Sequence, residues 1–77
     1  MPTLTEVIAL VLQADPASLH EDSGIDVVPN WDSMQQVVLV SMLEQTYEVV
    51  FTPDEITSEI SVGRLRSALA RKGIAAP

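Results

Sequence analysis

Three pairs of residues within positions 14–31 interrupt any regular backbone structure. They are Asp15-Pro16, Ser23-Gly24 and Pro29-Asn30, and no helix or strand of useful length tolerates them at this spacing. The segment is therefore predicted to be one long loop. Loops of more than about 12 to 15 residues are uncommon in compact domains, so we expect its own apolar side chains to hold it against the chain. The candidates are Leu19, Ile25, Val27 or Val28, and Trp31.

Helix start signals stand on both sides of this loop. Thr3 followed by Glu6 predicts a capping box and a helix from Leu4, whose apolar residues follow the i, i+3, i+4, i+7 rule. Asp32 is a suitable N-cap for a second helix that runs from Ser33 to about Val49.

Two further start signals divide the C-terminal part of the chain. Thr52-Pro53-Asp54-Glu55 predicts a short helix that ends near Ser58. Ser61 caps a last helix that buries Val62, Leu65 and Leu69 and stops at Gly73. The predicted fold is all-α: a small four-helix bundle of three longer helices and a short third one, with a long loop between the first two. Residues 1–77 are expected to form a single domain.

Composition excludes several classes of function. The chain has no cysteine and one histidine, His20, so disulfides, thiolate metal sites and cysteine nucleophiles are absent and no set of catalytic groups can be assembled. We therefore expect a protein that is not an enzyme and holds no metal. The net charge of -7 disfavours nucleic acid and anionic membranes, and no apolar run is long enough for a membrane span. A cytoplasmic monomer with basic partner proteins is the expectation.

The second predicted helix is apolar on two sides. Its buried face is predicted to be Leu39, Met42, Leu43, Tyr47 and Val50. That leaves Met34, Val37 and Val38 as a second apolar patch one turn beyond Ser33. Two interpretations stay open: the patch packs under the long loop, or it is a docking surface.

Ser33 lies at the start of this helix, where Asp32 already provides the cap. An anionic group on the serine would be favoured by the helix dipole by about 0.3 to 1 kcal/mol. No GxSxG-type turn surrounds the hydroxyl and no histidine stands near it, so another enzyme must install any group that it carries.

These residues resemble the acyl carrier protein family. Its Asp-Ser-Leu-type motif matches "WDSM", and "VVLVSMLEQTYEVVFTPDEI" and "ISVGRLRSAL" look like that family's later helices, so the resemblance covers Leu4 to about Lys72. Trp31, Gln35, Gln36 and Val38 depart from the common pattern, which has a small residue before the motif and carboxylates after it.

The resemblance implies that Ser33 receives 4'-phosphopantetheine from coenzyme A through a phosphopantetheinyl transferase, with Asp32 as part of the motif. The arm's thiol then holds acyl groups as thioesters for an acyl ligase or acyltransferase, a synthase and related enzymes of fatty acid, polyketide or similar biosynthesis. Because the apolar patch replaces carboxylates, these partners are expected to dock with more apolar contact and less sensitivity to salt. The candidate partner-binding residues are Met34, Val37, Val38, Ser41, Glu44, Glu48 and Ile56.

Two alternatives remain at this point. The cargo could be an amino acid, as in peptidyl or D-alanyl carriers, and the sequence barely separates the two. The protein could also be a helical adaptor that uses the apolar patch to bind a partner helix, with Ser33 unmodified.

Overall fold

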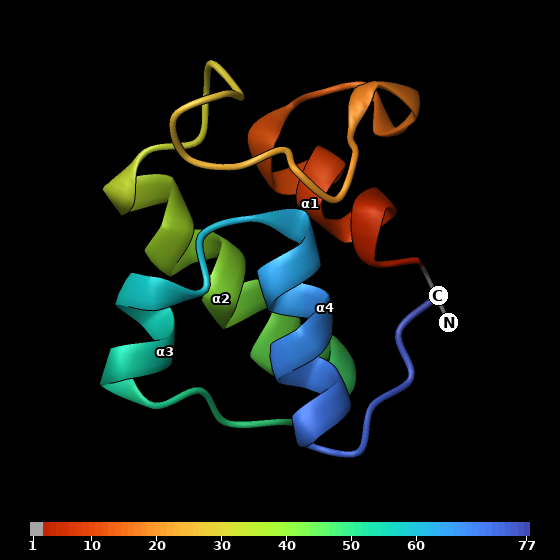
Figure 1. Cartoon of the computed structure of the whole chain (residues 1–77), viewed down its shortest axis with the longest axis vertical. Coiled ribbons are helices and arrows are strands. Elements are labelled where there is room, and N and C mark those ends of the chain that lie inside the picture. The colour runs from red at the N-terminus through yellow and green to blue at the C-terminus, as the bar shows by residue number, and fades with distance from the viewer. Residues whose placement is uncertain (1–2) are drawn as a thin grey trace.

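Four helices make up the regular structure of the computed structural model, which describes residues 3–77 (Figure 1). They are α1 (Leu4–Leu12), α2 (Ser33–Tyr47), α3 (Pro53–Ser58) and α4 (Val62–Arg71), with one 3-10 turn, η1 (Pro16–Ser18), between the first two. No strand is present within the described range. The all-α bundle, its short third helix and the long loop after the first helix are confirmed.

The core is built from aliphatic side chains of α1, α2 and α4. The i, i+3, i+4 stripe of α1 is buried, as the sequence predicts, and it packs against both α2 and α4. Figure 1 shows α4 crossing the middle of the molecule and α3 lying beside α2. The side chains that are fully buried include Leu4, Ile8, Leu12, Leu39, Leu43, Leu65 and Leu69.

Apolar side chains hold the long loop on the bundle. Leu19 and Trp31 are buried, and Ile25 and Val28 are half-buried against the core. Of the two valines, Val28 is therefore the anchor, because Val27 is 70% exposed. Asn30 adds a polar link at the C-terminal end of α1, where its side-chain amide donates to the carbonyl of Leu12 at 2.8 Å.

Backbone hydrogen bonds join the same loop to the connection between α3 and α4. The N–H of Ile25 donates to the Ile60 carbonyl at 3.1 Å, and the N–H of Val62 donates to the Ser23 carbonyl at 2.9 Å. This close approach requires glycine at position 24, because a Cβ there would lie 2.6 Å from the Ile60 oxygen. The Ser23-Gly24 pair thus ends regular structure and also fixes the loop in place.

The C-terminal end of α2 differs from the prediction. The helix ends at Tyr47, because Glu48 adopts a left-handed conformation with φ 55°. Val50 consequently leaves the helical register and is 78% exposed, so its predicted place on the buried face was wrong. Gln36 and Val40 are buried on that face together with Leu39, Leu43 and Tyr47.

Candidate functional site

Ser33 occupies the first position of α2 and its side chain is exposed. The residues before it hold it in place: Oδ1 of Asp32 accepts the N–H of Gln35 at 2.8 Å, and Trp31 is buried with 1% of its surface exposed. The first N–H groups of a helix point outward without partners in the helix. An exposed hydroxyl therefore stands at the positive end of a fixed fifteen-residue helix.

An apolar groove of about 280 Å³ begins at Ser33 and runs between α2 and α3. Three of its isoleucines come from different segments: Ile25 from the long loop, Ile56 from α3 and Ile60 from the connection to α4. We call it the α2–α3 groove. It is lined by Ile25, Ser33, Gln36, Val37, Ile56, Thr57 and Ile60.

A buried amide forms the inner side of this groove. The side chain of Gln36 is 3% exposed, and its Nε2 donates to the carbonyls of Ile56 at 3.0 Å and Glu59 at 2.9 Å. Its Oε1 accepts the indole N–H of Trp31 at 2.8 Å. Because the indole only donates and the carbonyls only accept, the orientation of this amide is fixed. Gln36 thus connects the residue two places before Ser33 to the C-terminal end of α3.

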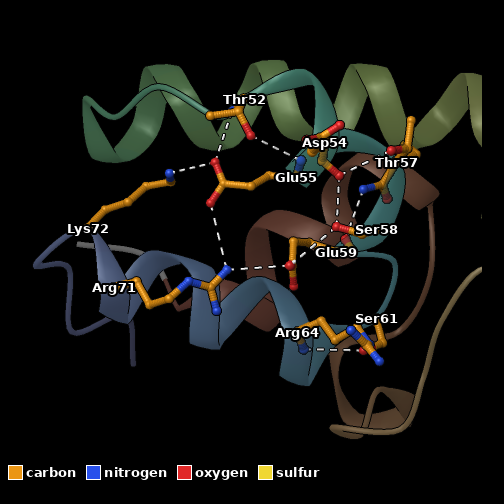
Figure 2. Close-up of polar contacts among 11 residues, drawn as sticks. Thr52, Asp54, Glu55, Thr57, Ser58, Glu59, Ser61, Arg64, Arg71 and Lys72 are labelled. Atoms are coloured by element: carbon orange, nitrogen blue, oxygen red, sulfur yellow. Dashed lines mark hydrogen bonds and ion pairs between the residues drawn. The ribbon is translucent and has the colours of Figure 1, made fainter.

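Four charged residues join the other side of α3 to α4 (Figure 2). Lys72 Nζ donates to Glu55 Oε1 at 2.7 Å, and Arg71 Nη2 lies 3.4 Å from Glu59 Oε1 and 3.7 Å from Glu55 Oε2. Lys72 also lies over the ring of Phe51, 5.1 Å from its centroid. We call Glu55, Glu59, Arg71 and Lys72 the α3–α4 ion-pair cluster. No α3 side chain is fully buried, and Ile56 packs only partly buried against the core, so the polar links at both sides add substantially to the attachment of this helix.

Acid should weaken this attachment. The hydrogen bond from Lys72, with a second from the Thr52 N–H, lowers the pKa of Glu55 from 4.5 to about 2. A carboxyl with a lowered folded-state pKa stabilises the fold above its unfolded pKa, and this stability is lost as the pH falls from about 5 toward 2. We expect Glu55→Gln to melt at a lower temperature than the parent protein at neutral pH, and the difference to shrink as the pH falls.

Thermal melting at several pH values between 7 and 2 measures this difference. Glutamine keeps an oxygen that can accept the Thr52 N–H, so the variant removes the ionisation while the cap survives. Glu6, whose pKa is lowered by its hydrogen bonds with Thr3, leaves some acid sensitivity in both proteins. A melting-temperature difference that is equal at all pH values would contradict the role given to Glu55.

Beside the groove, α2 exposes the apolar stripe predicted from the sequence. Met34, Val37 and Val38 are 74%, 55% and 47% exposed. Ser41, also exposed, continues the same i, i+3, i+4, i+7 row. The long loop does not cover the stripe, so the interpretation that these side chains pack beneath it was wrong.

The structure separates the predicted site residues into two groups. Ser33, Val37 and Ile56 meet in the groove, and Met34, Val38 and Ser41 adjoin them. Glu44 and Glu48 lie toward the far end of α2, roughly 16 and 22 Å along the helix from Ser33 at 1.5 Å per residue. Glu44 also has a local role, because its carboxylate accepts the N–H of Phe51 at 2.8 Å.

Gln36 is the residue at this site whose position the sequence interpretation missed. A signal was present, since Gln36 lies three and four residues before Leu39 and Val40, which places an amide on the buried face of the helix. A polar side chain in such a row indicates a buried hydrogen-bond partner elsewhere in the fold. Which partners these are depends on α3, and no local pattern contains that information.

Metal sites and membrane spans are two further features that can indicate a function. No group of three or more histidine and carboxylate side chains is placed to hold a metal ion within residues 3–77. None of the helices there combines the length and apolar character needed to cross a membrane. Comparison with models of known protein families gave no match, and the search of curated proteins gave none either.

Proposed function

We propose that the protein is an acyl carrier protein whose Ser33 carries 4'-phosphopantetheine. One observation carries the proposal: an exposed serine hydroxyl at the fixed N-terminus of α2 opens onto an apolar groove. The "WDSM" motif around it, with its resemblance to that family, supports the same assignment. The proposal includes a monomer located in the cytoplasm that is not itself an enzyme.

The chemistry at Ser33 is a phosphoryl-type transfer from coenzyme A. The Ser33 oxygen forms a bond to the phosphorus that bears pantetheine, the phosphoanhydride bond of coenzyme A breaks so that adenosine 3',5'-bisphosphate leaves, and the hydroxyl proton passes to a base of the transferase. A separate transferase supplies the base and Mg²⁺, since no histidine or lysine neighbours Ser33 in the amino-acid sequence. The arm brings the thiol that a chain without cysteine lacks.

The start of α2 is suited to the phosphodiester that results. All four basic residues belong to positions 64–72, far along the chain from Ser33, and three of them pair with Glu21, Glu55 or Glu59. The helix dipole supplies a favourable potential at Ser33, worth about 0.3 to 1 kcal/mol. A flexible arm on a rigid helix start then presents the thioester to a docked enzyme at high effective concentration.

Partner enzymes are expected to dock on the apolar stripe. Val38→Glu should lower the rate of Ser33 modification about tenfold, equivalent to about 1.4 kcal/mol, because a carboxylate would be desolvated in an apolar contact. The stability of the fold should change by no more than about 0.5 kcal/mol, since Val38 is half exposed. Initial rates of modification at low and high salt measure the effect.

Gln45→Glu is the matched control, because it adds the same charge to an exposed position on the same face of α2, two turns beyond Val38, without replacing an apolar side chain of the stripe. The control should modify at the parent rate, and the parent rate should change little with salt. Equal losses in both variants, or a parent rate that falls steeply with salt, would show that charge rather than apolar contact governs docking.

The exposed stripe also supports a second candidate function, an adaptor that binds a partner helix without modification of Ser33. The two are distinguished by mass spectrometry of the protein after incubation with coenzyme A and a transferase. An aminoacyl or peptidyl cargo in place of an acyl group is tested by loading assays with purified acyl and aminoacyl ligases.

A further inference from the structure

Gln36 stands where cargo entering the α2–α3 groove from Ser33 would meet the interior of the bundle. The outer part of the groove offers aliphatic side chains, Val37 and Ile56 among them, whereas its inner side is a buried amide. An alkyl chain gains free energy by covering apolar surface and none by touching an amide whose hydrogen bonds are already made. The chemical character of the groove therefore changes at residue 36.

Both N–H groups and the oxygen of the Gln36 amide already have hydrogen-bond partners. One Nε2 proton goes to the carbonyl of Ile56 in α3 and the other to that of Glu59, the residue that follows the helix, while Oε1 accepts the N–H of the Trp31 indole. An alkyl chain that passed Gln36 would leave the amide, the indole N–H and two carbonyls without partners in an apolar surrounding, which is strongly unfavourable.

The groove also resists widening by displacement of α3. Gln36 holds the C-terminal carbonyls of α3 on one side, and the α3–α4 ion-pair cluster holds Glu55 and Glu59 on the other. Moving α3 outward to admit a long chain would break both sets of contacts. The depth of the groove is thus set by polar links on two faces of one six-residue helix.

We propose that Gln36, fixed by Trp31, determines the cargo of this protein by barring long alkyl chains from the bundle interior. The inference rests on the proposed function of Ser33. It assigns the protein a cargo whose apolar part is short enough for the outer groove, or a cargo that stays outside the groove in solvent.

The absence of cysteine permits a test that needs no transferase. Ser33→Cys creates a single thiol in the chain, and alkyl methanethiosulfonates attach methyl, butyl, octyl or dodecyl groups to it as mixed disulfides. The melting temperature of each adduct, measured against the methyl adduct, reports how much alkyl chain the protein shelters. Because the label reaches the thiol directly, this test stands even if no transferase modifies the native serine.

We expect the melting temperature to rise from the methyl to the butyl adduct and to rise no further with octyl and dodecyl. Adding Gln36→Leu should extend the rise to the octyl adduct, on the order of 4 to 8 °C above the methyl adduct of the same variant. Gln35→Leu, which changes an amide outside the groove on the same helix, should keep the parent profile.

Two results would overturn the proposal: a melting temperature that climbs through dodecyl with Gln36 in place, or identical length profiles for the parent and Gln36→Leu. If Gln36→Leu fails to fold, the dependence of melting temperature on alkyl length in Ser33→Cys alone still tests the proposal. Trp31→Phe, which removes the indole donor and keeps an aromatic ring, then serves as the second variant and should shift the profile toward longer chains.

Discussion

Trp31→Ala should bring the protein close to unfolding at room temperature. Removing a fully buried tryptophan typically costs about 3 to 5 kcal/mol, and Trp31 is the largest of the fully buried side chains. A domain of 77 residues has a free energy of unfolding of roughly 4 to 12 kcal/mol in total. The indole anchors the long loop just before Ser33 and also supplies the hydrogen bond to Gln36, so both supports of the site are lost together.

Urea denaturation followed by far-ultraviolet circular dichroism measures this loss, since the chain contains no second tryptophan whose fluorescence could be used. Trp31→Phe keeps most of the buried apolar area but leaves Gln36 Oε1 without its donor. This unsatisfied oxygen should lower the free energy of unfolding by about 1 to 3 kcal/mol beyond the loss caused by the smaller ring. Leu10→Ala is the control, because Leu10 is 73% exposed and its replacement should change stability by no more than about 0.5 kcal/mol. A Trp31→Ala variant as stable as the control would refute the anchoring role.

The helices were predictable because their start signals are local. Thr3 and Thr52 each form a capping box with the glutamate three residues later, and Asp32 and Ser61 accept the N–H of the third helical residue. Such contacts join neighbours in the chain, so the sequence contains both partners. Gly73, with φ 86°, likewise follows the last helix where the sequence predicts its end.

The features that the sequence did not reveal are contacts between distant residues. Gln36 reaches α3 carbonyls twenty and twenty-three positions away, and Glu55 pairs with Lys72 seventeen positions away. A basic residue at a helix C-terminus is already explained by the dipole of its own helix, so Lys72 gave no sign of this partner. The exposure of Val50 depended on the conformation of one residue, Glu48, and a shift of two residues at a helix end is enough to misplace a side chain.

The candidate site follows the same division between local patterns, which the sequence contains, and contacts between distant residues, which it does not. Ser33 and Asp32 stood out from the motif, and the apolar stripe from the helical period of Met34, Val37 and Val38. The α2–α3 groove was beyond such patterns, because Ile25, Ile56 and Ile60 come together only when the loop and α3 pack beside α2. The chemical character of the groove is therefore set by tertiary structure.

Loss of the Ser33 hydroxyl should abolish the proposed modification altogether, the largest effect expected of any single change. The phosphodiester forms at one oxygen, so Ser33→Ala leaves the transferase no acceptor. Ser41→Ala is the matched control, because Ser41 is an exposed serine two turns further along the same helix, and the final mass shows whether the group is added even where a lost partner contact slows the reaction. Asp32→Ala should still accept the group, more slowly, because loss of the N-cap costs about 1 kcal/mol of helix stability and loosens the start of α2.

Mass spectrometry of the intact protein after incubation with coenzyme A, Mg²⁺ and a transferase of broad specificity is the most direct measurement. A carrier function predicts one added phosphopantetheine group on the parent protein and on Ser41→Ala, and none on Ser33→Ala. An unchanged mass for the parent protein, or an added group that persists in Ser33→Ala, would contradict it.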